Sequence, residues 1–270
     1  MYFTNLVECH EKREGFVSLS GKTSIITGGS DGIGRAIASK LASEGAHVVI
    51  CARNAEKLEA VAEDIKASGG SVETRVQDIA DTDSFAAMIA DVASSSGLDI
   101  LVNNAAHVGF GSVADASLED FRENFRVNVD ATYAGMQAAI RVMSEKGGSI
   151  VNISSINGDR AMPGMAGYSA SKAALLHLTR LASMETAAQN IRVNAVTPGP
   201  IMTPGTEAFI QSDPKAGDAI AAGIPMQRMG MPEEVANVVL FLASDMSSYV
   251  TGANIPVDGG KANELAVNQG

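Results

Sequence analysis

The stretch Thr27-Gly28-Gly29-Ser30-Asp31-Gly32-Ile33-Gly34 decides the fold of this chain. It follows a short β-branched run, 23–27, and precedes a helix-favouring stretch, 32–43. Glycines here allow a tight turn, let a ligand approach the backbone, and leave the free N–H groups of a helix N-terminus facing a phosphate. The spacing differs from the common Gly-x-Gly-x-x-Gly, but the strand, turn and helix together predict a dinucleotide-binding turn.

The same letters also allow a different interpretation. Residues 28–32 spell Gly-x-Ser-x-Gly, the turn that presents the nucleophilic serine of α/β-hydrolases, here Ser30. That serine would follow the first strand, with no earlier strand and loop to supply a second oxyanion donor. None of the four histidines, His10, His47, His107 and His177, comes late in the chain after a strand-end aspartate. Nucleotide binding is the favoured interpretation.

Outward from the turn, short apolar runs alternate with longer helical patterns. Strands are predicted at 23–27, 47–52, 71–76, 100–103, 149–153, 192–196 and 254–257, and helices at 32–43, 55–67, 82–95, 118–144, 170–188 and 232–243. The strands are apolar on both faces, which is typical of a buried parallel sheet. The pattern predicts an α/β fold: a doubly wound, mostly or wholly parallel seven-stranded sheet with helices on both faces, Rossmann-like.

No repeat or linker divides the chain, so a single domain is predicted over 19–260, with an N-terminal extension at 1–18 and a tail at 261–270. The stretch 198–230 interrupts the alternation. It carries Pro198, Pro200, Pro204, Pro214 and Pro225, and we expect a long mobile insertion that covers one end of the sheet as a substrate lid.

Composition limits the partners. The chain of 270 residues is 46% hydrophobic and carries a net charge of −11, which argues against nucleic acid or an anionic membrane. It has no run long enough to span a membrane and no secretory signal, and its two cysteines suggest no disulfide framework. We therefore expect a cytoplasmic protein. No cysteine and histidine cluster has metal-ligand spacing, so no metal is expected.

The end of the second strand selects the nucleotide. A carboxylate about 20 residues beyond the glycines would bind the ribose 2′-hydroxyl of NAD. This chain has Arg53 there, whose planar guanidinium can pair with the 2′-phosphate of NADP. Asp31 in the turn is a contrary signal, because its charge would repel that phosphate. NADP is the favoured cofactor, and NAD is the alternative.

Tyr168 and Lys172 lie four residues apart in a helix-favouring stretch, so they share one helix face. A fixed positive charge beside a phenol lowers its pKa of about 10, and such a tyrosine could give or take a proton near neutral pH. A solvated surface pair is the alternative, because a Tyr-x-x-x-Lys spacing also arises by chance.

The glycine turn and the Tyr-Lys pair together resemble the short-chain dehydrogenase/reductase family in its single-domain form, over about residues 19–260. Further motifs match in order. They are Asn103-Asn104-Ala105-Ala106, Asn128 within Val127-Asn128-Val129, Ser155 thirteen residues before Tyr168, Pro198-Gly199 with Thr203, Asp78 after the third strand, and Val257-Asp258-Gly259-Gly260. Ala106 departs from the family's glycine.

The resemblance implies a hydride transfer between NADP(H) and a carbonyl or secondary alcohol. Tyr168 would be the general acid or base, Ser155 would bind the substrate oxygen, Lys172 would support the phenol and the nicotinamide ribose, and Asn128 would hold a relay water. The implied cofactor contacts are Gly28, Ser30, Asp31, Gly32, Ile33 and Gly34 at the pyrophosphate, Asp78 and Ile79 at the adenine, Asn104 and Ala105 beside the ribose, and Pro198, Gly199, Ile201 and Thr203 at the carboxamide. The family also commonly forms homotetramers through the long helices that correspond to 118–144 and 170–188, so a homotetramer is expected, with a homodimer as the alternative.

Methionines gather toward the expected substrate end: Met162, Met165, Met202, Met226, Met229 and Met231. Methionine fills irregular apolar space, so we expect an apolar pocket for a medium-sized carbonyl compound. Core packing or a subunit contact is the alternative. A nucleotide-binding protein without catalysis stays a further alternative.

Overall fold

The computed structural model describes residues 17–263. Seven strands form one sheet in the order β3-β2-β1-β4-β5-β6-β7, and every pairing is parallel. The strands are β1 Thr23–Thr27, β2 His47–Ala52, β3 Ser71–Val76, β4 Ile100–Asn103, β5 Gly148–Ile153, β6 Ile191–Pro198 and β7 Asn254–Val257. The expected Rossmann-like architecture is confirmed, with the strand order reversing between β1 and β4.

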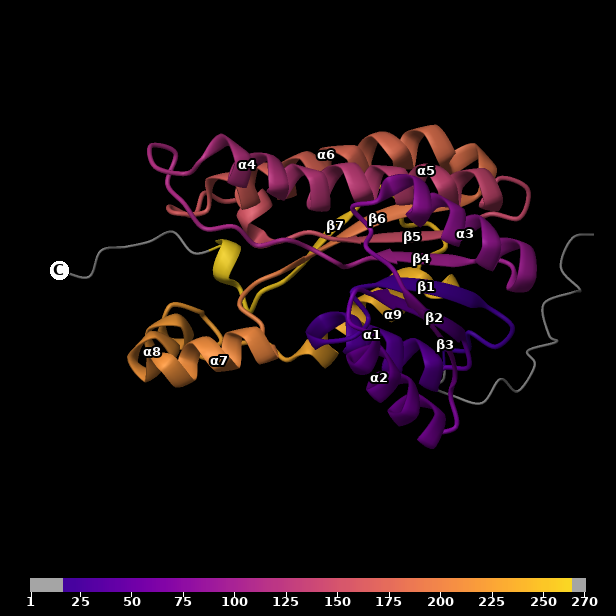
Figure 1. The fold of residues 1–270 in the computed structure, drawn as a ribbon, viewed down its shortest axis with the longest axis horizontal. Coiled ribbons are helices and arrows are strands. Elements are labelled where there is room, and N and C mark those ends of the chain that lie inside the picture. Colours follow the sequence, from indigo (N-terminus) through magenta and orange to yellow (C-terminus); the bar gives the residue numbers. More distant parts are fainter. Residues whose placement is uncertain (1–16, 264–270) are drawn as a thin grey trace, which may run out of the picture.

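Helices cover both faces of the sheet (Figure 1). On one face lie α1 Gly32–Ser43, α2 Ala55–Ala67 and α9 Pro232–Ala243; on the other lie α3 Thr82–Ser96, α4 Leu118–Phe125, α5 Ala131–Met143 and α6 Ala166–Thr186. Successive side chains of a strand point to opposite faces. Accordingly, Ile26 and Ile50 pack in the core beneath α1 and α9, whereas Ile25 and Val49 pack in the core beneath α3 and α5.

Two segments differ from expectation. Residues 118–143 are helical throughout, as expected, but a π-helical turn, Arg126–Asp130, interrupts the regular α-helix between α4 and α5. Such turns often occur at functional sites, and this one carries the buried Asn128. The stretch 198–230, which we expected to be a mobile insertion, carries secondary structure that was not predicted. It contains α7, Pro204–Ser212, and α8, Pro214–Ala222, each of which begins at a proline in its first turn.

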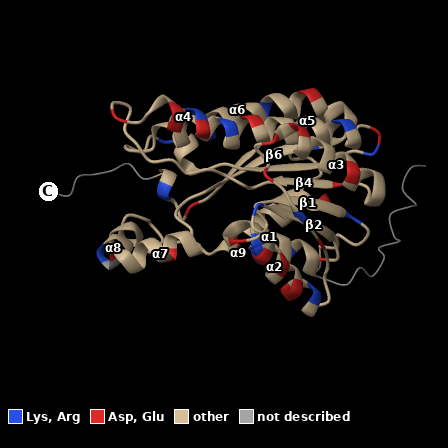
Figure 2. Ribbon diagram, viewed as in Figure 1, with Lys and Arg blue, Asp and Glu red and all other residues tan. Residues whose placement is uncertain are grey.

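The helices α7 and α8 stand away from the layered body, at the end of the molecule toward which the loop before α4 also extends (Figure 1). Charged residues lie mainly on the helices and loops, and the inner strands are nearly free of them (Figure 2). Of the proposed N-terminal extension and C-terminal tail, residues 1–16 and 264–270 lie outside the described residues. Within residues 17–263 no helix is long and apolar enough to cross a membrane.

Candidate active site

The glycine turn after β1 is packed so closely that side chains do not fit. A Cβ added to Gly34 would lie 2.1 Å from the carbonyl oxygen of Gly28, and one added to Gly28 would lie 2.8 Å from Nδ2 of Asn104. Gly28 also has a φ of +66°, which favours glycine. The Asn104 amide donates to the carbonyls of Thr27, at 2.9 Å, and Gly28, at 3.3 Å. The β4 end therefore holds the turn in place.

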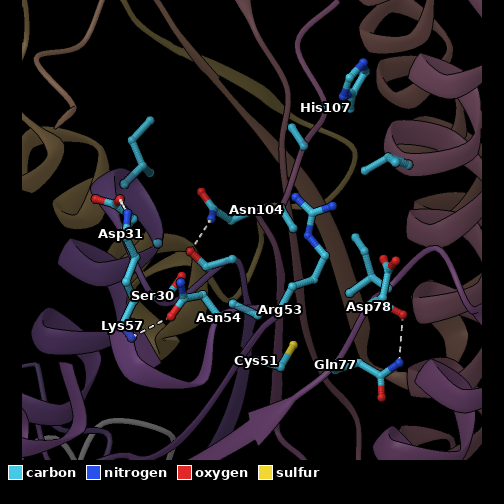
Figure 3. Close-up of a pocket in the computed structure, with 18 of the residues that line it drawn as sticks. Ser30, Asp31, Cys51, Arg53, Asn54, Lys57, Gln77, Asp78, Asn104 and His107 are labelled. Carbon is cyan, nitrogen blue, oxygen red and sulfur yellow. Dashed lines mark hydrogen bonds and ion pairs between the residues drawn. The ribbon is translucent and has the colours of Figure 1, made fainter. Parts of the chain in front are cut away.

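A pocket of about 780 Å³ opens beside this turn (Figure 3). It lies at the carboxyl ends of β1, β2 and β4, where open α/β sheets bind their ligands. Many residues of the predicted cofactor site line it: Gly28, Ser30, Asp31, Ile33, Gly34, Arg53, Asp78, Ile79, Asn104, Ala105 and Thr203. A bare glycine turn with an extended pocket fits the pyrophosphate and adenosine of a dinucleotide.

The other predicted cofactor residues do not line this pocket. Gly32 lies beneath the lid, because a Cβ there would approach Thr203 Cγ2 to 3.3 Å. Pro198 ends β6, and a Cβ on Gly199 would meet Asp258 at 2.8 Å. Ile201 is paired with Gly230 in an isolated parallel bridge. These residues form the base from which α7 and α8 extend.

The sequence reasoning missed several residues of the pocket wall. They are Cys51, Asn54, Lys57, Gln77, Glu123 and Arg126; the wall also contains Ala52, Ala106, His107 and Val127, which neighbour residues of the predicted site. Asn54 accepts a hydrogen bond from Lys57 N at 2.9 Å as the N-cap of α2, a role that its position before a helical pattern could have revealed. Glu123 and Arg126 come from α4 and the π-helical turn, and no spacing in the sequence links them to the glycine turn.

The repulsion that Asp31 would exert on the 2′-phosphate of NADP is weaker than the sequence suggested. Its Oδ1 accepts from Gly32 N at 2.7 Å, and its Oδ2 pairs with Lys57 Nζ at 2.7 Å. Burial raises the pKa of Asp31, but the bonds from Lys57 and Gly32 outweigh burial and leave the pKa below its ordinary value. Asp31 is therefore charged, and its charge is matched by Lys57.

A second group of side chains lies along the start of α6. Lys172 is 2% exposed, and its Nζ donates to the Ile153 carbonyl at 2.8 Å. The same Nζ lies 5.7 Å from the centre of the Tyr168 ring, and a side-chain hydrogen bond joins Tyr168 to Ser155. Ser154, in contrast, is buried and bonds to the Lys172 carbonyl. The structure thus brings Ser155, Tyr168 and Lys172 together.

The pKa of the Tyr168 phenol is shifted in the direction opposite to the one expected from the sequence. Burial raises the pKa of Tyr168, and the hydrogen bond from Ser155 offsets only part of that rise. Burial also lowers the pKa of Lys172 to about 8. Both groups are removed from water, which disfavours the phenolate and the ammonium alike. The prediction that Lys172 brings the phenol pKa below its ordinary value is therefore wrong for the chain alone.

Asn128 is fixed in the π-helical turn by three bonds. Its Oδ1 accepts from His107 N at 2.8 Å, and its Nδ2 donates to the His107 carbonyl at 2.9 Å and to Ser171 Oγ at 3.0 Å. Ser171 precedes Lys172, so Asn128 ties the loop after β4 to the helix that carries Tyr168. Its contact to a relay water stays a prediction.

The rival nucleophile and a metal site find no support in the described residues. Ser30 makes no hydrogen bond to a histidine within residues 17–263, although it lines the pocket. The same residues contain no group of three or more histidine, cysteine, aspartate or glutamate side chains that could hold a metal ion.

Comparison with known proteins gives consistent matches. A family model described as enoyl-(acyl carrier protein) reductase matches residues 28–262. The 3-oxoacyl-(acyl-carrier-protein) reductase of Thermotoga maritima is 39% identical over 244 residues, which cover 90% of this chain and 98% of that protein.

Solved structures agree over the same span. A candidate NAD(P)-dependent gluconate 5-dehydrogenase from Beutenbergia cavernae, with NADP bound at low occupancy, has a TM-score of 0.88 and 37% identity over 93% of this chain and all of that one. A short-chain type dehydrogenase/reductase from Mycobacterium marinum has a TM-score of 0.84 and 36% identity, covering 90% of this chain and 96% of that one. The chain therefore belongs to the short-chain dehydrogenase/reductase family and is an NAD(P)-dependent oxidoreductase.

Proposed function

We propose that this protein transfers a hydride between NADP(H) and an apolar, medium-sized carbonyl compound or the matching secondary alcohol. The observation that carries the proposal is the group Ser155, Tyr168 and Lys172, in which a buried ammonium lies 5.7 Å from a phenol ring that is hydrogen-bonded to a serine. Bound nicotinamide would supply or accept the hydride. The roles of the side chains below are proposals that follow from this geometry.

Tyr168 gives its proton to the substrate oxygen when a ketone is reduced and takes it back when an alcohol is oxidised. Because burial keeps the pKa of Tyr168 above its ordinary value, the phenol is protonated at neutral pH and is suited to act as the acid of reduction. Ser155 hydrogen-bonds the same oxygen. Lys172, with a pKa of about 8, carries its proton near pH 7 and lies beside the ring of Tyr168, and it would also bind the nicotinamide ribose.

The apolar substrate is supported by exposed apolar side chains in the loops that precede α4 and α6. Phe110 is 77% exposed and Met162 is 54% exposed, and their two loops are joined by the bond from Gly111 N to the Gly164 carbonyl at 2.7 Å. Among the methionines of this end, Met229 is buried in the core, whereas Met226 and Met231 are exposed. Among the similar proteins, the 3-oxoacyl-(acyl-carrier-protein) reductase supports an apolar substrate, whereas the gluconate 5-dehydrogenase supports a polar one.

NADP is proposed over NAD because Arg53 lines the pocket and donates no hydrogen bond to any residue in the range 17–263. A related structure with bound NADP supports this choice. NAD is the second candidate, because Asp31 is a charged carboxylate in the glycine turn. Comparing NADPH with NADH as the reductant separates the two.

The test follows reduced nicotinamide by its absorbance across a panel of apolar ketones and small keto acids. We expect Tyr168→Phe to lower kcat by about 100- to 10,000-fold, because the proton donor is lost. Its dissociation constant for NADPH should stay unchanged. Tyr133→Phe, at an exposed position on α5, is the matched control and should keep full activity.

Three results would contradict the proposal. Full turnover by Tyr168→Phe would overturn the acid role, and ester hydrolysis that Ser30→Ala abolishes would support a hydrolase. A protein that binds NADPH but turns over no carbonyl or alcohol would be a non-catalytic nucleotide binder. Homotetramer formation through α4, α5 and α6 also stays a prediction, which light scattering would test.

A further inference from the structure

The pocket beside the glycine turn has balanced charges. Three cations, Arg53, Lys57 and Arg126, and three carboxylates, Asp31, Asp78 and Glu123, line it. Arg126 pairs with Glu123 at 2.7 Å, and Lys57 pairs with Asp31 at 2.7 Å. An incoming dianionic phosphate therefore meets one arginine without a hydrogen-bonded partner in residues 17–263 and one lysine that is already paired.

Lys57 reaches the pocket from the first turn of α2. Its backbone N–H bonds to Asn54, the N-cap residue that directly follows Arg53, so the two cations enter the pocket from one short segment. Figure 3 shows the Lys57 side chain running from α2 to Asp31, and Arg53 extending between Asn104 and Asp78. The Lys57 side chain is 57% exposed. An ammonium has three donors, and the bond to Asp31 uses one of them.

Asp31 is oriented toward its own helix and toward Lys57. One carboxylate oxygen accepts from Gly32 N and the other accepts from Lys57 Nζ, so both oxygens are engaged. Arg35, the other cation that acts on Asp31, is bound to Asp64 at 2.8 Å and does not line this pocket. Asp31 therefore acts on the pocket chiefly through Lys57, whose ammonium it fixes beside the turn.

We propose that Lys57 is a specificity-determining residue that binds the 2′-phosphate of NADP together with Arg53, and that Asp31 is the positioning residue which holds its ammonium at the pocket. This inference rests on the proposed use of NADP(H). It gives Asp31 a role opposite to simple repulsion, because the carboxylate fixes a cation that would otherwise move freely on a four-carbon side chain. The alternative is that the Lys57–Asp31 ion pair has only a structural role and stabilises the packing of the glycine turn on α2 (the brace).

The test measures binding rather than turnover. Calorimetry compares 2′,5′-ADP, which carries the 2′-phosphate, with 5′-AMP, which lacks it. We expect Lys57→Met to weaken 2′,5′-ADP binding by about 10- to 100-fold, because a charge-assisted hydrogen bond is lost, and to leave 5′-AMP binding unchanged. Lys66→Met, an exposed lysine in the last turn of the same helix, should change neither. Lys57→Arg should restore most of the affinity.

The role of Asp31 is tested by adding Asp31→Asn to Lys57→Met. Without the ammonium the carboxylate repels the phosphate, so its removal should recover part of the lost 2′,5′-ADP affinity. An unchanged 2′,5′-ADP affinity in Lys57→Met, with a lower melting temperature, would overturn the inference in favour of the brace. That result would leave NADPH-dependent ketone reduction untouched, so the two proposals fail separately.

Discussion

Helix α1 buries Gly34, Ile37, Ala38, Leu41 and Ala42 against the sheet, whereas α7, in the stretch proposed as the lid, buries none of its residues. Around α1, backbone and side chains are fixed by contacts such as the Asn104 bonds to the glycine turn. In the lid, Phe209 is half exposed, and α7 and α8 stand apart from the body (Figure 1).

This difference in packing corresponds to two different tasks, cofactor binding at the glycine turn and substrate entry near α7 and α8. A pyrophosphate is the same in every dinucleotide, so its binding turn can be rigid. A substrate must enter and leave, and segments that do so are drawn from the least stable parts of a protein. The lid can therefore change with little effect on folding, while the turn cannot.

A pair of glycine substitutions gives the sharpest contrast. Gly34→Ala places a Cβ 2.1 Å from the Gly28 carbonyl oxygen, and we expect it to lower the free energy of unfolding by about 4 kcal/mol or more. Gly205→Ala in α7 meets only Thr203 Oγ1 at 4.0 Å and should stabilise the helix by up to about 1 kcal/mol. Urea denaturation measures both. Equal effects would remove the distinction between the two regions.

The same contrast explains how far the sequence alone can lead. The seven strands and their parallel direction could be predicted from apolar runs such as Val48–Cys51, which are buried on both faces. The glycine turn is readable because a clash at Gly34 excludes other residues. Among the described elements, eight match their predicted bounds, namely β1, α1, β2, α2, β3, β4, α9 and β7.

The remaining features depend on contacts between distant segments. The π-helical turn at Asn128 forms where its amide bonds to His107, 21 residues away, and helix periodicity carries no trace of this bond. The pairing of Lys57 with Asp31 joins residues 26 positions apart. The pKa of Tyr168 depends mainly on the burial of its side chain, which cannot be inferred from the i, i+4 spacing of Tyr168 and Lys172. The helices α7 and α8 were not predicted, because proline interrupts most helices but can also begin one, as Pro204 does.

The buried Lys172 on α6 gives a prediction of intermediate size. Burial lowers its pKa from 10.5 to about 8. Between these values the unfolded chain holds a proton that the native protein lacks, so the free energy of unfolding rises with pH, by up to about 3 kcal/mol in total. Tyr168, whose pKa burial raises, acts in the opposite sense only at higher pH.

The measurement is urea denaturation from neutral pH to about pH 10. Lys172→Met removes the titrating group and should lack the rise seen in the native protein, whereas the exposed Lys66→Met should retain it. A rise of the same size in Lys172→Met would mean that the lysine ionises as it does in water.

The smallest effect is expected at the substrate opening. Phe110 is 77% exposed, so Phe110→Ser removes little buried surface and should change the free energy of unfolding by less than about 0.5 kcal/mol. If apolar ketones rest on this side chain, their KM should rise by about 3- to 10-fold, since partial burial of one ring contributes about 1 kcal/mol. The KM for NADPH and for small keto acids should not change. The exposed Tyr249→Ser is the matched control, because it lies after α9 and away from the loop of Phe110. A uniform rise in KM for polar and apolar substrates would show that Phe110 shapes the loop rather than the apolar contact.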